Sequence, residues 1–301
     1  MIYEYAVSPH LFGSPENLKL LFQAFEPGSG RLISDYPRRK WLQYVRAFIK
    51  KSIQEESERN AWIELLISLE KHALFERQGP IWDDHNGVDW IMNAINEHHR
   101  RPFRGILNDK ASAGEPDIIP IGVSMYSHSR WKVPSTQSIP RCAIDMVKSV
   151  ADLIDMSTSL ILVDRNFNPA DGRFSKVLVA FADYLLKVRT HQPRIQQIKF
   201  VTTYEQEHCN KTSKQFEKRC QEFLPGILPY GIEVKFYLKV KNLLHPRLVL
   251  TNKGCVNFEF GLDEGNGEVV LSRLSVDDFE KEWAQWDKKV GHQFTIAGLK
   301  N

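Results

Sequence analysis

Cysteine is scarce in this 301-residue chain, and the cysteines that are present are widely spaced and form no CxxC pair. This spacing argues against a zinc ribbon and against a disulfide scaffold. We therefore expect reduced thiols and a cytoplasmic location. A run of 18 apolar residues and a basic segment at the start are also missing, so the sequence predicts neither a membrane span nor a secretion signal. The cysteines are Cys142, Cys209, Cys220 and Cys255.

The chain also lacks a strong excess of charge, because its formal net charge is only +3. Any site for an anion must therefore be a local patch of basic residues. The motifs GxGxxG, GxxxxGK[ST], HExxH and GxSxG do not occur, which excludes the common forms of dinucleotide site, nucleoside triphosphate site, zinc protease and serine hydrolase. We expect no cofactor and no metal.

The first third of the sequence has the periodicity of helices. Ser14 is a predicted N-cap with Pro15 at the first helical position, and apolar residues follow at helical spacing in two segments, 41–53 and 62–69. These patterns predict a mainly helical N-terminal domain over residues 1–105. Residues 106–139 are rich in Gly, Ser and Pro, and are predicted to form a connector with at most an edge strand.

From residue 140 onward, short apolar strands alternate with amphipathic helices. This alternation predicts an α/β domain over residues 140–301, a layered mixed sheet flanked by helices, with antiparallel strands near the end. The final helix is predicted to begin at Ser275 with a capping box that uses Asp278.

The most informative segment is "LLHPRLVLTNKGCVNFEFGLDEG", residues 243–265. His245 and Arg247 are two residues apart, so an extended chain places both side chains on one face. A protonated histidine and an arginine repel each other, and the pairing is most reasonable if an anion binds between them. Asn252 follows five residues after Arg247, just beyond the end of the strand.

This segment resembles the HxKxxxxD motif of the phospholipase D superfamily of phosphodiesterases. His245 matches the histidine, while Arg247 stands in place of lysine and Asn252 in place of aspartate. The arginine and the "FGLDEG" that follows look more like the C-terminal phospholipase D-like domain of certain MIT-domain proteins and of related prokaryotic proteins expected near phage-defence genes. The resemblance covers about residues 140–290.

The resemblance implies that His245, Arg247 and Asn252 stand at catalytic positions. In active members, two histidines from two motif copies act together, so this chain would need a homodimer that pools two His245 residues. Arginine can still bind a phosphate bidentately, whereas asparagine lacks the charge that would hold the histidine protonated. The substitutions therefore preserve anion binding better than turnover.

Several neighbouring residues complete the predicted phosphate-binding set. Three lysines add positive potential around the motif, although lysines also protect the edges of sheets. Asp164 ends a predicted strand, where α/β proteins bind ligands, but its Asn- and Pro-rich loop is equally typical of an ordinary turn. Besides Arg247, the set contains Lys239, Lys241, Lys253, Asp164, Asn166, Asn257 and Asp263.

A second basic stretch, "NEHHRRPFR" at residues 96–104, has two interpretations. Clustered arginines can bind phosphates, but cations also suit the C-terminal end of a helix dipole, and we favour this second interpretation. Adjacent histidines on a helix point about 100° apart and make poor metal co-ligands.

The leading hypothesis is a protein that recognises phosphodiesters, most reasonably DNA or another nucleic acid, within a prokaryotic defence or mobile-element complex. The first alternative is a metal-independent nuclease that acts as a homodimer through His245. A second is an interaction scaffold with a vestigial site, and a third is a binder of lipid headgroups. The sequence leaves open whether the protein is an enzyme.

Overall fold

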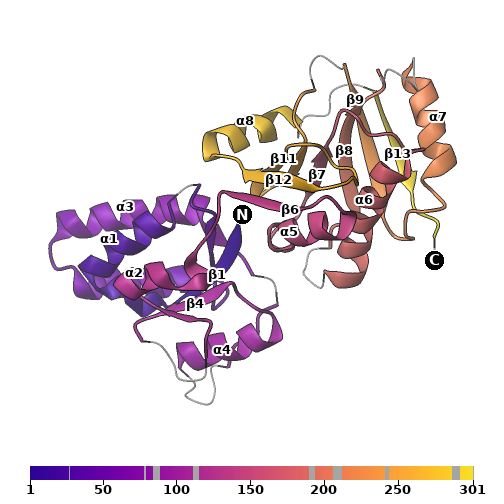
Figure 1. Ribbon diagram of the computed structural model, residues 1–301. Coiled ribbons are helices and arrows are strands. Elements are labelled where there is room, and N and C mark those ends of the chain that lie inside the picture. The colour runs from indigo at the N-terminus through magenta and orange to yellow at the C-terminus, as the bar shows by residue number, and fades with distance from the viewer. Residues whose placement is uncertain are drawn as a thin grey trace. The chain divides into compact units, whose positions relative to one another are not determined.

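The computed structural model divides the chain into two compact units, Ile2–Pro134 and Ser135–Asn301 with Met1 (Figure 1). Each unit has its own sheet and is described separately below. The residues that the structure describes are 1–26, 28–77, 79–83, 89–110, 115–189, 194–205, 212–240, 244–286 and 292–300.

The first unit is built on a parallel sheet of five short strands in the order β3-β2-β1-β4-β5. Its strands are β1 (Tyr3–Val7), β2 (Arg31–Ser34), β3 (Leu74–Phe75), β4 (Gly105–Asn108) and β5 (Ile118–Pro120). Its α-helices are α1 (Pro15–Ala24), α2 (Trp41–Ser52), α3 (Glu56–His72) and α4 (Trp90–Arg100), and short 3-10 helices include η1 (Pro9–Gly13).

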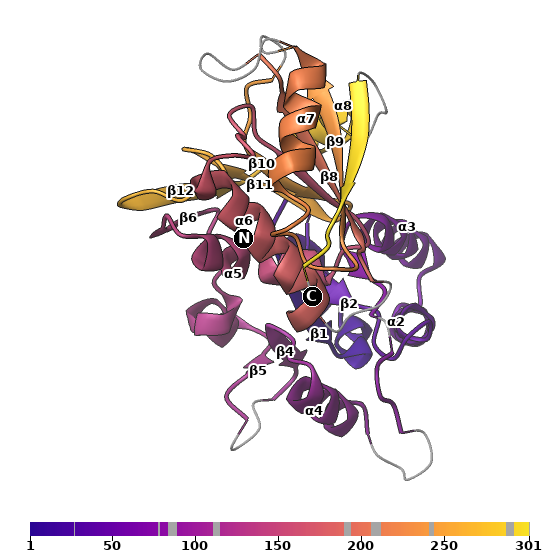
Figure 2. The same cartoon turned by 90° about the vertical axis from the view of Figure 1, so that its right-hand side faces the viewer.

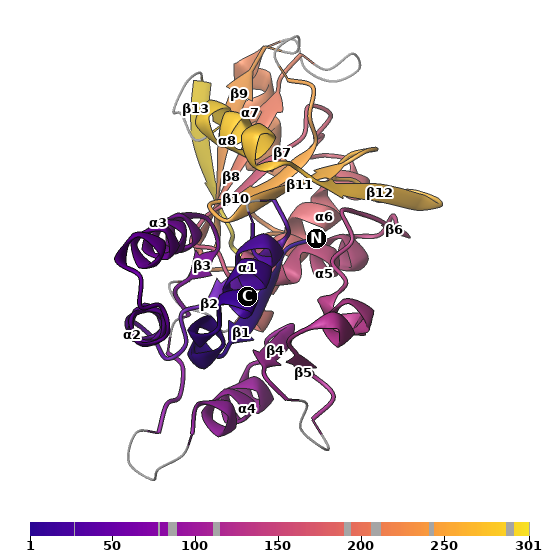
Figure 3. The same ribbon diagram turned by 90° about the vertical axis from the view of Figure 1, so that its left-hand side faces the viewer.

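Alternate residues of this sheet belong to two different cores. Tyr5, Val7 and Ile33 pack with residues of α1, α2 and α3, whereas Ala6 and Ile106 pack with residues of α4. Helices therefore cover both faces of the sheet, as Figure 3 shows for α1 and α4. Both faces of a parallel sheet are covered because each crossover lays a helix on it.

The predicted domain boundary was wrong for this unit. The mainly helical description misses the parallel sheet, and residues 106–134 belong to the same compact unit instead of a connector. The reason is physical, because strands of two to five residues that are buried on both faces carry no alternation of polar and apolar positions. The predicted cap of α1 is confirmed, since Ser14 Oγ accepts a hydrogen bond from the backbone N–H of Asn17.

The basic stretch at residues 96–104 forms part of a buried ion-pair network. Arg77 is fully buried and donates to Glu97 at 2.8 Å and to Glu4 at 2.7 Å. Arg100 also donates to Glu97, and His98 lies 3.0 Å from Asp117. The stretch includes the last turn of α4, as the favoured interpretation expects, and His98 and Arg100 already have carboxylate partners in their own unit instead of forming a phosphate patch.

The second unit contains a mixed sheet in the order β13-β9-β8-β7-β10-β11-β12-β6. Its strands are β6 (Thr136–Pro140), β7 (Leu160–Val163), β8 (Gln197–Thr203), β9 (Glu233–Lys239), β10 (Leu248–Thr251), β11 (Gly254–Phe258), β12 (Glu268–Arg273) and β13 (His292–Ala297). Its α-helices are α5 (Ala143–Asp155), α6 (Gly172–Asp183), α7 (Ser213–Phe223) and α8 (Val276–Trp286). The predicted α/β architecture with a mixed sheet and flanking helices is confirmed.

The central strands β7, β8 and β9 are parallel, and the strands on either side of them are antiparallel. On one face, Trp286 of α8 packs with Ile161, Val163 and Leu248. On the other face, Phe236 of β9 lies against Phe216 of α7, and Figure 2 shows α7 running beside β8 and β9.

Local sequence signals fix the ends of the helices in this unit. The capping box of α8 is confirmed, because Ser275 Oγ accepts from the N–H of Asp278 at 3.1 Å and donates to its carboxylate at 2.7 Å. At the start of α6 the Asp171 side chain accepts from the N–H of Arg173, and at the start of α7 that of Thr212 accepts from the N–H of Gln215. In the described segments of the chain, no helix is both long and apolar enough to span a membrane.

Candidate functional site

The candidate site lies at the edge of the second sheet where the parallel strands β7, β8 and β9 end. Ligands of open α/β sheets bind beyond the carboxyl ends of such strands. Asp164 directly follows β7, and Lys239 is the last residue of β9. The antiparallel strand β10 begins at this same edge, since Leu248 pairs with Val163. The preceding residue, Arg247, therefore lies opposite Asp164.

Asp164 is completely buried, and backbone amides occupy both of its carboxylate oxygens. Its Oδ1 accepts from the N–H of Asn166 and its Oδ2 from the N–H of Leu262, both at 2.7 Å. Burial raises the pKa of the Asp164 carboxyl, while these two hydrogen bonds and the nearby Arg247 oppose that rise. Asp164 therefore fixes the loop after β11 to the end of β7, and it does not present an oxygen to a ligand.

Gly261 lies between the side chains of Asp164, Asp263 and Arg247. Its φ of +117° favours glycine, and a Cβ placed on it would lie 3.0 Å from Oδ2 of Asp164, 3.2 Å from Oδ1 of Asp263 and 3.8 Å from Nε of Arg247. The two carboxylates and the guanidinium thus converge on one point. The Nε of Arg247 is buried and has no hydrogen-bond partner in the described part of the chain. A ligand oxygen or an ordered water would satisfy such a donor.

Two more arginines converge on Asp263. Arg141 forms an ion pair with its Oδ1 and also donates to its backbone carbonyl at 3.2 Å. Arg173 lies 3.6 Å from Oδ2, and its side chain is 58% exposed. Asp263 therefore holds two guanidinium groups that come from distant parts of the sequence. The sequence prediction missed both arginines, although Arg173 follows the predicted β7 loop closely enough to have been considered.

His245 precedes β10 at this edge and is exposed. Leu244 and Leu248 both belong to the core under α8, so the alternation of an extended chain directs His245 and Arg247 to the opposite face. His245 makes no hydrogen bond or ion pair among the residues that the structure describes. The expectation that these two residues share a face is therefore consistent with the packing of their neighbours.

The structure does not bring every predicted residue to this edge. Asn252 and Lys253 form the turn between β10 and β11, at the opposite end of the strand, where the Asn252 side chain accepts from the N–H of Thr158 at 2.9 Å. Asn257 pairs with Leu248 and so points to the α8 face, away from Arg247. Lys241 lies outside the described residues.

The remaining predicted residues contribute in different ways. Asn166 is exposed, and its contribution to the site is its backbone N–H, which donates to Oδ1 of Asp164. Lys239 is half-buried at the end of β9, and burial lowers the pKa of its ammonium group. Among the described residues, no group of three His, Cys, Asp or Glu side chains is placed to hold a metal ion.

The second unit carries the whole net charge of the chain. Residues 135–301 contain 23 Lys and Arg against 20 Asp and Glu, a difference of +3, which equals the net charge of the full sequence. The basic excess is thus on the unit that holds the candidate site, and the first unit is neutral. This charge attracts polyanions only weakly, because three positive charges spread over a unit produce a small electrostatic field.

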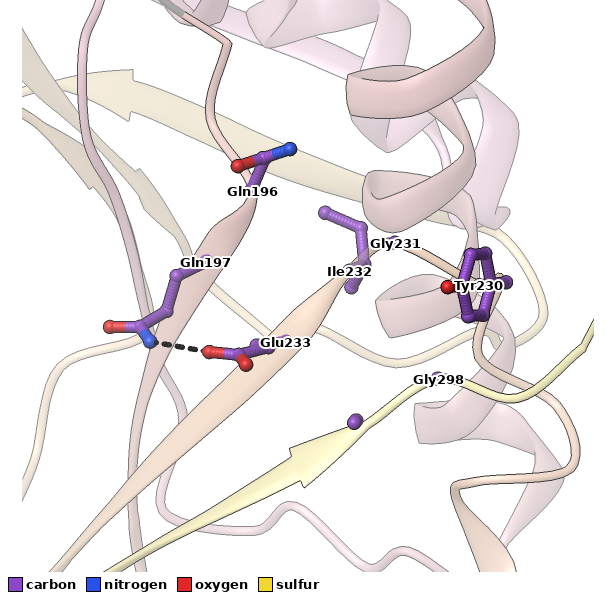
Figure 4. Close-up of a pocket in the computed structure, with 8 residues that line it drawn as sticks. Gln196, Gln197, Tyr230, Gly231, Ile232, Glu233 and Gly298 are labelled. Carbon is purple, nitrogen blue, oxygen red and sulfur yellow. Dashed lines mark hydrogen bonds between the residues drawn. The ribbon is translucent and has the colours of Figure 1, made fainter.

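A separate hollow of about 640 Å³ lies at the other end of the same sheet. Gln197 and Glu233, the first residues of β8 and β9, form a hydrogen bond of 3.0 Å at its wall, and Tyr230 and Gly298 lie nearby (Figure 4). Because the amino ends of the parallel strands line it, this hollow is distinct from the arginine cluster, the name used below for Arg141, Arg173 and Arg247.

Comparisons with known proteins do not assign the chain to a family. No family model matches the sequence, and no curated protein matches it. A solved structure of TrmBL2, an archaeal chromatin protein with a novel mode of DNA binding, aligns over 77% of this chain and 82% of its own, with 11% identity and a TM-score of 0.25. At that TM-score, the similarity does not bear on the fold or the function of this chain.

Proposed function

We propose that the second unit recognises the phosphodiester backbone of nucleic acid at the carboxyl edge of β7, β8 and β9. The observation that carries the proposal is the convergence of Arg141, Arg173 and Arg247 on the two carboxylates around Gly261. Planar guanidinium groups that are held in fixed positions are suited to bidentate contacts with phosphate oxygens. The resemblance of His245 and Arg247 to a phosphodiesterase motif points to the same chemistry.

The carboxylates have a positioning role in this proposal. Asp263 is nearly buried and binds two arginines, so it orders side chains that would otherwise be mobile. Asp164 orders the loop that contains Gly261 through the amide of Leu262. A preorganised set of donors loses less entropy when a phosphate binds than a set of free side chains does.

The test uses Arg247→Gln, which removes the charge but keeps much of the side-chain volume. Fluorescence anisotropy measures the affinity for labelled single-stranded DNA, duplex DNA and RNA at salt concentrations from about 50 to 200 mM. We expect Arg247→Gln to weaken binding about tenfold and to reduce the slope of log K against log salt by about 0.7 to 0.9. Arg247→Lys should retain more affinity than Arg247→Gln does.

Lys253→Gln is the matched control, because it removes one positive charge from the same unit at the opposite end of β10. It should leave both affinity and salt slope nearly unchanged. The proposal is rejected if wild-type protein binds none of the three nucleic acids, or if Arg247→Gln and Lys253→Gln have equal effects.

A metal-independent nuclease is the second candidate, favoured by the exposure of His245 beside Arg247. An imidazole that makes no hydrogen bond or ion pair with any described residue is available to attack phosphorus or to protonate a leaving oxygen. This candidate requires cleavage of DNA or RNA in the presence of EDTA, and the variant His245→Asn should abolish that cleavage. Binding without cleavage leaves recognition as the function.

A further inference from the structure

The loop after β11 exposes one aromatic ring beside the arginine cluster. Phe260 is 53% exposed, whereas the next three residues, Gly261, Leu262 and Asp263, are buried. An exposed phenylalanine forgoes the favourable burial that such a ring normally has. The ring stands at the site itself, since Gly261 is the residue on which the two carboxylates and Arg247 converge.

The backbone on both sides of Phe260 is firmly held. The N–H of Glu259 donates to the carbonyl of Val270 at 3.1 Å, and the N–H of Gly261 donates to the carbonyl of Phe258 at 3.2 Å. The next amide, that of Leu262, donates to the Asp164 carboxylate. The ring is therefore presented to solvent by an ordered loop, and it has not been left exposed by a loose one.

Two guanidinium groups from other parts of the chain contact this loop, and one of them lies near the ring. Arg141 lies with its guanidinium carbon 5.8 Å from the ring centroid, and its Nη2 donates to the Phe260 carbonyl at 3.4 Å. Arg247 donates from Nη1 to the carbonyl of the preceding residue, Glu259, at 3.5 Å. An aromatic ring is thus exposed on a short segment whose backbone two arginines contact, and proteins that bind single-stranded nucleic acid combine aromatic rings and cations in this way.

We propose that Phe260 stacks on an unpaired base whose phosphate lies on the arginine cluster, so that the site prefers single-stranded nucleic acid to duplex. This inference rests on the proposed function, because the stacked base needs a backbone bound next to it. In a duplex, both faces of each internal base are covered by neighbouring bases, so a surface ring finds no free face to stack on. In a single strand, every base has a free face, and stacking is tolerant of sequence.

The test compares Phe260→Ala with Phe223→Ala in anisotropy titrations of labelled single-stranded and duplex DNA of equal length. Phe223 is the matched control, because it is 41% exposed and ends α7 in the same unit. We expect Phe260→Ala to weaken single-strand binding roughly 5- to 150-fold and to change duplex binding less than about twofold. The salt slope should not change, because no phosphate contact is lost.

Two further variants separate stacking from simple apolar contact. Phe260→Trp should keep the single-strand affinity, since the indole offers a larger face, whereas Phe260→Leu should lose nearly as much as Phe260→Ala. All variants change an exposed side chain, and their thermal unfolding should match that of the wild type.

The outcomes distinguish this inference from the proposed function. Stacking is overturned if Phe260→Ala leaves single-strand binding intact, weakens duplex binding equally, or behaves like Phe223→Ala, and also if Phe260→Leu retains wild-type affinity. If Arg247→Gln weakens binding while Phe260→Ala does not, phosphate recognition stands and only the stacking is wrong. If neither variant changes binding, both proposals fail.

Discussion

Replacing Gly261 with alanine should disturb the candidate site and the fold around it together. The residue has a φ of +117°, which L-amino acids rarely adopt. Holding a residue with a side chain in a conformation of this kind costs about 1–3 kcal/mol. The added methyl carbon would also lie 3.0 Å from the Asp164 carboxylate and 3.2 Å from that of Asp263. Overpacking in a closed site costs about 1–3 kcal/mol more.

The structure offers a control that separates these two costs. Gly267 lies in the same unit with a φ of +81°, and a Cβ placed on it meets nothing within 4 Å. Gly267→Ala should therefore cost only the backbone contribution, about 1–2 kcal/mol. We expect Gly261→Ala to destabilise the unit by about 2–6 kcal/mol, because it adds the steric contribution to the backbone one.

Hydrogen exchange measured by mass spectrometry gives the free energy of opening for peptides from β7, β10 and β11. In Gly261→Ala, exchange should become faster mainly in these strands, because the carboxylates of Asp164 and Asp263 must move to admit the methyl group. The reasoning is refuted if Gly261→Ala costs no more than Gly267→Ala, since the carboxylates would then not be fixed around this point.

Two further predictions concern the first unit. Arg77→Met should destabilise it by about 3–5 kcal/mol, because Glu4 would lose its ion pair and Glu97 would lose its fully buried partner and keep only Arg100 and Arg101. Hydrogen exchange of β1 and α4 peptides checks this, with Arg38→Ala, in a half-exposed ion pair, as a control expected to cost less than about 1 kcal/mol. Burial lowers the pKa of His98, although its hydrogen bond to Asp117 opposes this. The contribution of His98 to stability is therefore present above its unfolded pKa of about 6.5, and it is lost as the pH falls through the lower pKa of the folded state. The difference in melting temperature between wild type and His98→Gln should therefore shrink as the pH falls below about 6.5, and a constant difference would contradict the assignment.

The second unit could be predicted from the sequence because its elements carry strong local signals. The strand β9 alternates cleanly, with Val234, Phe236 and Leu238 on one face, and Ser275 and Asp278 form the capping box that their spacing predicts. The first unit could not be predicted in the same way, because its parallel strands are short and buried on both faces. Its helices were visible, since their apolar residues recur every three or four positions.

The candidate site shows a similar division. The motif located Arg247, and the end of a buried strand located Asp164, because both follow from the register of a single segment. The motif misplaced Asn252, because four strand residues separate it from Arg247 and carry it to the far end of β10. Arg141 lies more than 100 residues from Arg247 in sequence and reaches the site only through tertiary contacts, so no local pattern could find it.

The charge balance of the site limits how it can bind a polyanion. The site and the residues that pair with it contain four cations and four carboxylates. The cations are Arg141, Arg173, Lys176 and Arg247, and the carboxylates are Asp164, Asp171, Asp263 and Glu264. A phosphate must therefore compete with the carboxylates for these cations, and long-range electrostatic attraction contributes little to binding. With three arginines available to a single strand, the slope of log K against log salt should be no steeper than about −2, since each phosphate contact contributes about 0.7. A much steeper slope would mean that other lysines make most of the contacts, and the arginine cluster would then not be the principal binding site.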